Sequence, residues 1–193
     1  MGRLPREFFA ADSRELAPHL LNKLLVRGER VGRIVEVEAY AGAADPASHA
    51  FRGMTARNAT MFGPPGHLYV YFTYGMHFCA NVVCGPEGEA SAVLLRGLTP
   101  VAGVEAMRAA RGSAARRDRD LCSGPGKLCQ ALGLDRSFDG ADLVTGDRGV
   151  EVVDDGVPPP AVPGVSGRIG LSVATEVPWR FYVPGAVGIS RAR

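Results

Sequence analysis

Apolar and polar residues alternate along several short stretches of the chain, which is the pattern of half-buried β-strands. The first two stretches, residues 24–27 and 31–40, are joined by a turn at Gly28. Further strands are predicted at 68–74, 77–84, 90–98, 168–173 and 180–183. Because these strands follow one another instead of alternating with helices, they predict an α+β fold with an antiparallel sheet.

Helix start and stop signals predict three helices between these strands. An Asp-x-x-Glu capping box opens a helix over residues 12–21, and a Thr-Pro pair opens another over 99–111. A Ser-Gly-Pro sequence opens the third, over 123–133, and a glycine closes it. Residues 42–66 are rich in glycine and proline and are predicted to be irregular. A stretch of that length in a compact domain is usually functional.

The composition fits one globular domain. Hydrophobic residues make up 46% of the chain and charged residues 22%, and the 25 glycines predict many turns. Polar residues interrupt the longest apolar run, so it predicts buried strands and not a membrane-spanning helix. The N-terminus has no apolar signal core. A cytoplasmic location without a membrane partner is therefore expected.

Charge is distributed unevenly, although the net charge is only +2. Residues 108–119 contain five arginines and one aspartate, whereas residues 142–155 contain five acidic residues and one arginine. One side of the molecule could meet phosphates while the other stays in water. For the arginine cluster taken alone, a solvated charge run is the simpler interpretation.

Cysteine and histidine spacing gives no sign of a metal site. The four cysteines form no C-x-x-C pair and are predicted to be reduced and structural: Cys79, Cys84, Cys122 and Cys129. The histidines have no ligand-like spacing either: His19, His49, His67 and His77. Neither a metal nor another cofactor is predicted.

The strand segment 34–40, with the sequence IVEVEAY, places two carboxylates beside a tyrosine. Alternate side chains share a face of a strand, so Glu36, Glu38 and Tyr40 point one way and the apolar residues between them point the other. Carboxylates are costly to bury without a purpose, which favours a functional site. An edge strand with its charged face in solvent explains the motif equally well.

Three of the five tyrosines lie within residues 69–74. Tyr69 and Tyr71 share a face, and Tyr74 lies at a turn. Aromatic strands are usually part of a core, but a tyrosine at the tip of a turn is exposed, and exposed rings can stack on bases. The glycines and Lys127 at the start of the 123–133 helix could hold an anion, although a plain capped helix start is the simpler explanation.

Taken together, these segments resemble the alkyladenine (3-methyladenine) DNA glycosylase family. The matching stretches are collinear and cover nearly the whole chain. They are GRIVEVEAYAG (32–42), ASH (47–49), TARNATMF (55–62), HLYVYFTYGMHFCANVV (67–83), AVLLRGLTP (92–100), RDLCSGPGKLCQALG (119–133) and RFYVPG (180–185). The resemblance implies a single mixed domain, residues 1–193, with a curved antiparallel sheet flanked by helices.

The resemblance also implies roles for individual residues. Glu38 matches the general base, Arg96 matches its neighbour in the catalytic site, and Tyr74 matches the residue that wedges into the duplex. The residues that match the pocket of the flipped base are Tyr40, His49, Tyr71 and Asn81. The residues that resemble DNA-backbone contacts are Arg57, Ser123, Gly124 and Lys127.

The function implied by this resemblance is base-excision repair. The enzyme would flip an alkylated or deaminated purine out of duplex DNA, hydrolyse the N-glycosidic bond with a water activated by Glu38, and leave an abasic site. A lyase would need an amine nucleophile, and the two lysines, Lys23 and Lys127, lie outside the catalytic motifs. The expected state is a monomer on damaged double-stranded DNA in a bacterial-type cytoplasm, associated with the nucleoid.

Two other functions remain open. A non-catalytic nucleic-acid-binding module would share the fold but would leave Glu38 among the aromatic residues without a role. A hydrolase of free nucleosides would not need an exposed Tyr74.

Overall fold

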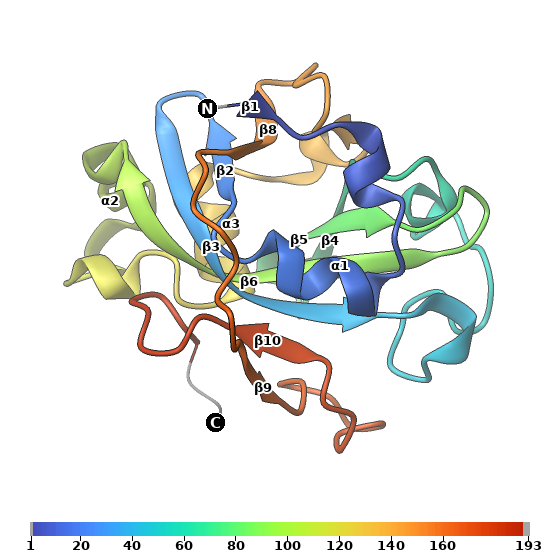
Figure 1. Ribbon diagram of the computed structural model, residues 1–193. Coiled ribbons are helices and arrows are strands. Elements are labelled where there is room, and N and C mark those ends of the chain that lie inside the picture. Colours follow the sequence, from blue (N-terminus) through green and yellow to red (C-terminus); the bar gives the residue numbers. More distant parts are fainter. Residues whose placement is uncertain (1, 191–193) are drawn as a thin grey trace.

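The computed structural model describes residues 2–190 and arranges them around a curled antiparallel sheet (Figure 1). The order along the sheet is β1-β8-β2-β3-β6-β5-β4-β7, and β10 pairs with β3 and β9. The strands are β1 (Gly2–Arg3), β2 (Leu24–Arg27), β3 (Arg30–Tyr40), β4 (His67–Thr73), β5 (His77–Cys84), β6 (Ser91–Ala102), β7 (Ala141–Asp142), β8 (Val150–Asp154), β9 (Gly164–Ser166) and β10 (Arg180–Tyr182). These strand pairings are all antiparallel, which confirms the α+β class.

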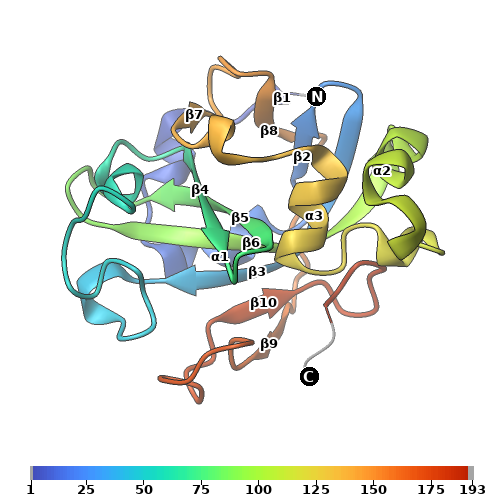
Figure 2. The same ribbon diagram turned by 180° about the vertical axis from the view of Figure 1, so that it is seen from behind.

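Helices flank the sheet on both faces. The α-helices of the described residues are α1 (Ser13–Leu20), α2 (Val104–Arg111) and α3 (Pro125–Leu132). In Figure 1, α1 lies in front of the sheet, and the reversed view brings α3 to the front (Figure 2). Asp12 caps α1 by accepting a hydrogen bond from the Arg14 N–H, and Gly133, with a φ of 68°, ends α3. Buried side chains of all three helices join those of the sheet in one main core, so the described chain forms a single domain.

The strand β3 positions the candidate site. Its residues 30–33 pair with β2, its residues 36–38 pair with β10, and β6 pairs with its other edge. Glu36 and Glu38 therefore lie in an interior strand, and both are fully buried. This position excludes the alternative of an edge strand with its charged face in solvent.

The helix predicted over residues 99–111 begins later than expected. Thr99 and Pro100 continue β6 and pair with β3. A proline is tolerated in this strand because the β3–β6 ladder is irregular close to it. The helix starts only after Gly103, which has a φ of 65° and lies so close to β3 that a Cβ there would be 2.5 Å from the Glu29 carbonyl oxygen.

The strand predicted over residues 168–173 does not form. The strand of this region is β9, which ends at Ser166, and residues 168–173 are irregular. Their polar groups bind side chains instead of a neighbouring strand, since the Ile169 N–H donates to the Glu38 carboxylate. The strand predicted over 180–183 is confirmed as β10.

All five acidic residues of the 142–155 run are paired with basic side chains rather than free in solvent. Asp154 lies 2.6 Å from the Lys23 ammonium, and Asp155 lies 2.6 Å from the Arg33 guanidinium. The same run includes β8, a strand that its charged residues hid from the sequence pattern. Acidic side chains at this sheet edge therefore bind neighbouring strands together.

The described residues can be searched for membrane-spanning helices, metal sites and disulfides. Within residues 2–190, no helix is long and apolar enough to cross a bilayer. The same residues hold no cluster of three His, Cys, Asp or Glu side chains placed to bind a metal ion. All four cysteines are free and buried, as predicted for structural thiols.

Candidate active site

The candidate site is built around three buried charged residues of the sheet. Glu36 and Glu38 point to the same side of β3, and Arg96 reaches both of them from β6. The Arg96 Nε lies 3.2 Å from Glu36 Oε1, and the Arg96 Nη1 lies 3.3 Å from Glu38 Oε2. The fold thus brings Glu38 and Arg96 together, and Glu36 shares the same guanidinium.

Glu38 accepts two further hydrogen bonds. The Tyr40 hydroxyl donates to Oε2 at 3.0 Å, and the Ile169 N–H donates to Oε1 at 2.7 Å. An ionised carboxylate offers about four lone-pair positions, so the three donors leave one position for a water molecule. Burial raises the pKa of Glu38 above that of an ordinary glutamate, and its hydrogen-bond donors oppose only part of that rise.

Glu36 is held differently, although it lies only two residues away. Its Oε1 accepts from Arg96, from Arg180 at 2.6 Å and from the Ser190 hydroxyl, while its Oε2 accepts from the Ser190 N–H. Three of these four donors share Oε1, and Oε2 lies against β6, where a Cβ at Gly97 would be 3.1 Å from it. Glu36 therefore anchors the C-terminal segment and meets protein groups at both oxygens.

An aromatic pocket lies beside Glu38 and encloses about 50 Å³. It is lined by Tyr40, Ala47, His49, Met61, Tyr69, Tyr71, Asn81 and Leu171. The rings of Tyr69 and Tyr71 stack with centroids 5.4 Å apart, and the His49 ring meets Tyr71 edge-on at 4.5 Å. The four residues assigned to a base pocket from the sequence, Tyr40, His49, Tyr71 and Asn81, thus line one cavity.

The polar groups of the pocket come mainly from His49 and Asn81. The His49 Nδ1 lies 3.2 Å from the Tyr69 hydroxyl, and the Asn81 side-chain amide donates to the Tyr69 carbonyl. Burial lowers the pKa of His49, and the charge of nearby Arg57 lowers it further. Both influences favour a neutral imidazole, which has one donor and one acceptor.

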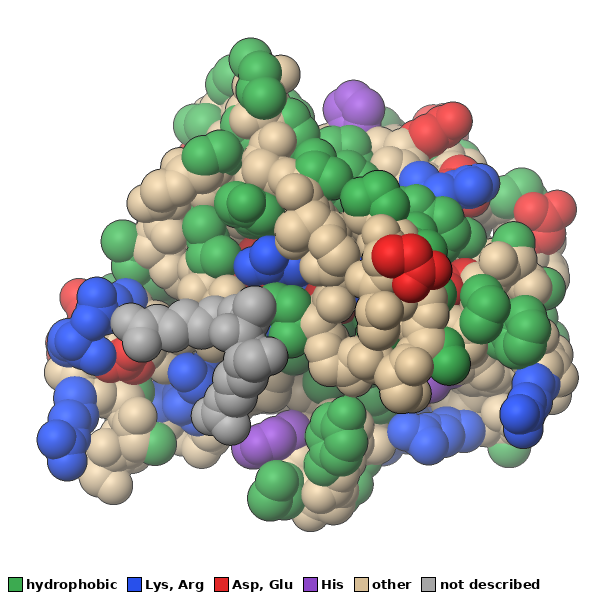
Figure 3. Space-filling model, turned by 90° about the horizontal axis from the view of Figure 1, so that it is seen from below, with side chains coloured by type: hydrophobic (Ala, Val, Ile, Leu, Met, Phe, Trp, Pro, Cys, Tyr) green, Lys and Arg blue, Asp and Glu red, His purple; other side chains and the backbone are tan. Residues whose placement is uncertain are grey.

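A larger cleft of about 960 Å³ opens beside Arg96. Its other lining residues are Tyr74, Arg117, Arg119, Asp120, Ser123, Gly124, Lys127, Ile169, Gly170 and residues 185–190. Lys and Arg side chains gather at the left and lower edges of the face seen in Figure 3. Of the residues predicted to contact DNA backbone, Ser123, Gly124 and Lys127 line this cleft. Arg57 lies elsewhere, with its guanidinium 5.7 Å from the Tyr71 ring.

Tyr74 projects from the turn between β4 and β5. It is 80% exposed, and its φ of 50° is unusual for a residue other than glycine. A hydrogen bond from the Met76 N–H to the Thr73 carbonyl closes the turn. Below the turn, His77 packs so closely on α3 that a Cβ at Gly126 would lie 2.9 Å from its side chain. Tyr74 is therefore not a core aromatic residue.

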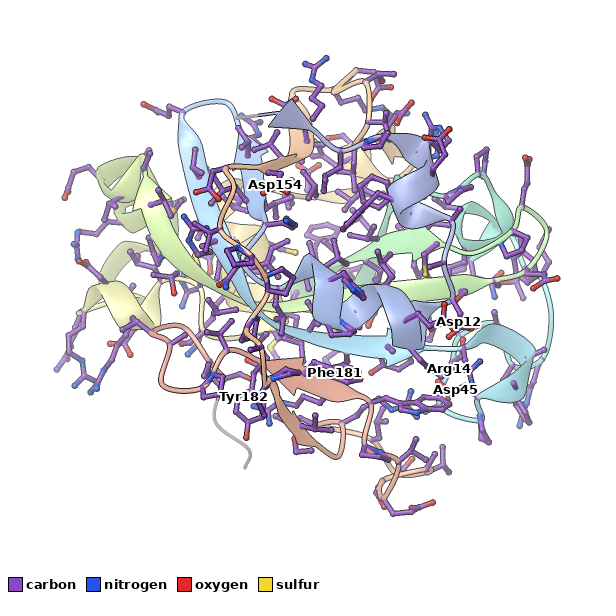
Figure 4. The ribbon with its side chains drawn as sticks, viewed as in Figure 1. Asp12, Arg14, Asp45, Asp154, Phe181 and Tyr182 are labelled. Carbon is purple, nitrogen blue, oxygen red and sulfur yellow. The ribbon has the colours of Figure 1, made fainter. Side chains whose placement is uncertain are left out.

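Several residues of the site lie in the C-terminal segment and are not apparent from the sequence patterns. They are Arg168, Ile169, Arg180 and Ser190. In Figure 4, the labelled residues Phe181 and Tyr182 mark β10, which pairs with β3 in the sheet. The sequence does contain one signal for a functional residue in this segment: Arg168 is the single charged residue between positions 156 and 175.

A buried carboxylate held by an arginine, with an aromatic pocket and a cleft lined by basic side chains nearby, defines the class of protein: a hydrolase with a pocket suited to a ring. A family model described as methylpurine-DNA glycosylase (MPG) matches residues 7–187. The chain belongs to this family, whose members hydrolyse N-glycosyl bonds.

Curated relatives agree with the family model. A protein of Burkholderia lata is 58% identical over 183 residues, which are 94% of this chain and 88% of the relative. A protein of Streptomyces avermitilis is 49% identical over 98% of this chain and 92% of its own length. A protein of Chlorobaculum parvum is 48% identical over 100% of this chain and 93% of its own. Each carries the name "Putative 3-methyladenine DNA glycosylase".

Proposed function

We propose that this DNA repair glycosylase is monofunctional and excises alkylated or deaminated purines from double-stranded DNA. The observation that carries the proposal is the position of Glu38, which binds Tyr40 of the aromatic pocket and Arg96 and Ile169 of the basic cleft and has one acceptor position free. A water bound there would lose a proton to Glu38 as it attacks C1′ of the flipped nucleotide. The products are the free base and an abasic site.

The two cavities suit the two halves of a flipped nucleotide. Flipping costs roughly a few kcal/mol, and an exposed ring such as Tyr74 can offset part of it by filling the gap in the stack. The cleft beside Tyr74 would hold the backbone, and the aromatic pocket would hold the base. Rings of Tyr40 and Tyr71 favour electron-poor, alkylated purines through cation–π attraction.

A general acid is not required for a cationic leaving group. A purine alkylated at a ring nitrogen already carries positive charge, so it departs without protonation, unlike the leaving-group oxygen of an ordinary glycoside. A neutral purine such as hypoxanthine would take its proton from water as it departs. Glu36 is not assigned this task, because its two oxygens are engaged by Arg96, Arg180 and Ser190 and it does not line the aromatic pocket. Glu38 is therefore the single carboxylate in the proposed chemistry.

The lysines give no support for a lyase mechanism. Lys23 is buried and paired with Asp154 at 2.6 Å. Lys127 donates to Ser123 at the start of α3 and lines the cleft, not the aromatic pocket. No strand nick is expected unless alkali is added, and borohydride should trap no covalent protein–DNA adduct.

The test is excision from defined DNA. Duplex oligonucleotides that each carry one 3-methyladenine, 7-methylguanine, hypoxanthine or etheno-adenine are incubated with the protein and then treated with alkali. We expect cleavage at one or more lesions, and none of the matching free nucleosides should be hydrolysed. Binding without excision would favour a nucleic-acid-binding module, and hydrolysis of the nucleosides would favour the rival hydrolase.

The proposal also places the enzyme in the cytoplasm, as a monomer on nucleoid DNA.

The pH dependence of the single-turnover rate provides an independent check. Only ionised Glu38 can accept a proton, so the rate should fall as the pH drops through its pKa. Because burial raises that pKa, the fall should begin at a higher pH than for an exposed glutamate. A rate that stays constant until the protein unfolds would contradict the role of Glu38.

A further inference from the structure

A buried ion pair lies next to the candidate base without taking part in the proposed chemistry. Arg168 binds Asp45 through both guanidinium Nη atoms, at 2.5 Å to Oδ2 and 2.9 Å to Oδ1. Neither side chain has any exposed surface. Asp45 lies just past the end of β3 (Figure 4), whereas Arg168 lies in the irregular segment before β10, 123 residues further along the chain.

The guanidinium also holds the surroundings of this pair. Arg168 lies over the ring of Tyr40 at 4.7 Å and over the ring of Trp179 at 5.1 Å, and it donates to the Ala39 carbonyl. Within residues 2–190, its Nε has no hydrogen-bond partner. Burying two charges is costly and adds little net stability. Stability alone is therefore a weak reason for this arrangement.

The pair fixes two of the three donors that Glu38 has. Ile169, whose N–H binds Glu38 Oε1, is the next residue after Arg168. Tyr40, whose hydroxyl binds Glu38 Oε2, lies directly beneath the guanidinium. The remaining donor, Arg96, is held separately by Glu36. Two anchors thus position the donors of one carboxylate from opposite sides.

We propose that the Arg168–Asp45 pair, here called the clamp, is a positioning device for Glu38. It sets the direction of the free acceptor position by holding Ile169 and Tyr40 in place, and through Leu171 it holds one wall of the aromatic pocket. The clamp touches neither the water nor the base, so its residues are positioning residues. The inference rests on the proposed role of Glu38 as general base.

The chain offers a matched control for a test. Arg33 binds Asp155 in the same bidentate manner, at 3.2 and 2.6 Å, and this pair also fastens a later segment to β3. It joins the half of β3 that pairs with β2 and is partly exposed. Neither of its residues contacts Glu38 or lines the pocket or the cleft.

Neutral double variants avoid leaving a lone buried charge. In Asp45→Asn/Arg168→Met both charges of the clamp are removed, and in Arg33→Met/Asp155→Asn both charges of the control pair are removed. Arg168→Lys, a third variant, keeps the charge but loses the bidentate fork. Melting temperature, DNA affinity and the single-turnover rate against pH are measured for each variant and for the wild type on the best-cleaved lesion.

The clamp variants should lose about 10- to 100-fold in the saturated single-turnover rate, because small misplacements of reacting groups are that costly. DNA affinity should stay within twofold of wild type. The acid limb of the rate should move to higher pH, since weaker donors favour protonated Glu38. Apart from Arg168, the ionisable groups that face Glu38 are the same in the clamp variants as in the wild type. They are Glu36, Tyr40, Tyr71, Cys79 and Arg96.

Two results would overturn the inference. A lower melting temperature with an unchanged saturated rate and acid limb would make the clamp merely structural. An equal loss of rate in the Arg33→Met/Asp155→Asn control would show that removing any ion pair that attaches a later segment to β3 lowers the rate. If the double variant does not fold, Arg168→Lys decides by the same two readouts. Absence of excision by the wild type on every lesion would instead contradict the proposed function itself.

Discussion

Glu36 and Glu38 are identical side chains on one face of one strand, yet their surroundings assign them opposite tasks. The first is held by four donors from Arg96, Arg180 and Ser190, and the second keeps an acceptor position free. Burial without full compensation leaves Glu38 with a raised pKa. Environment, and not residue type, therefore separates a structural carboxylate from a candidate base.

Replacing Glu38 by glutamine should separate activity from stability. Loss of a general base typically costs about 10²–10⁴-fold in rate, so single-turnover excision should fall by that factor while DNA binding survives. A raised pKa in the folded state means that protonation favours folding, and the ionised group costs stability above its unfolded-state pKa. Glu38→Gln should accordingly melt at or above the wild-type temperature at neutral pH.

Glu36→Gln is the matched comparison. It leaves Arg96 and Arg180 with a weaker partner, and breaking a buried ion pair costs about 3–5 kcal/mol in the free energy of unfolding. This variant should melt well below the wild type. A Glu38→Gln protein that melts as low as Glu36→Gln, or that retains most of its excision rate, would contradict the assignment.

The sequence could indicate the carboxylates and aromatic residues but not the groups that orient them. Alternation along residues 34–40 already placed Glu36 and Glu38 on one face. The Ile169 N–H that binds Glu38 comes from 131 residues away and belongs to the backbone, which has no residue-type signal. Such contacts depend on how the C-terminal segment returns to β3, and a local pattern cannot show this.

At the scale of elements, the hairpin of β4 and β5 is where local sequence predicted structure best. Aromatic residues mark β4 and a run of apolar residues marks β5, and the turn falls where expected. The helix predicted over residues 99–111 forms, but it begins only after Gly103, because a Thr-Pro pair is also compatible with the irregular end of a strand. The strand predicted over residues 168–173 does not form. The Ile169 N–H binds the Glu38 side chain of β3 instead of the backbone of a neighbouring strand.

Truncating Tyr74 should impair flipping without unfolding the hairpin. Because the residue is 80% exposed, Tyr74→Ala should change the free energy of unfolding by about 0.5 kcal/mol or less. A wedge stabilises the flipped state, so its loss should reduce the flipped fraction, seen with a fluorescent base analogue at the lesion.

Tyr74→Phe keeps the ring and serves as the control, and it should flip the base nearly as well as the wild type. Equal flipping by Tyr74→Ala and Tyr74→Phe would remove the wedge role. A sharply lowered melting temperature for Tyr74→Ala would show that the ring supports the fold.

For the molecule as a whole, charge distribution matters more than net charge. The chain carries only +2, yet Lys127 and three arginines, Arg96, Arg117 and Arg119, line the cleft beside Tyr74. The acidic residues Asp154 and Asp155 are paired at the far edge of the sheet. The sequence showed both charge runs, but only the fold shows that one of them reaches the candidate site.

The salt dependence of DNA binding tests this arrangement. Each lost phosphate contact should reduce the slope of log affinity against log salt by about 0.9. Lys127→Gln should show this change and bind more weakly. Arg3→Gln removes the same charge from β1, where Arg3 pairs with Glu151, and its slope should match that of the wild type. Equal slopes for the two variants would place the backbone contact elsewhere.

The turn that carries Tyr74 has a further consequence for how a repair glycosylase searches DNA for a lesion. A backbone hydrogen bond from Met76 to Thr73 closes the turn, and the Tyr74 ring is exposed on it. A repair enzyme meets undamaged DNA far more often than a lesion. If the probing ring had to be ordered at each encounter, the loss of side-chain and backbone freedom would be repeated every time. If Tyr74 is the wedge that we propose, a turn formed once, during folding, would let the protein test successive base pairs quickly, and its shape would serve the search as much as the reaction.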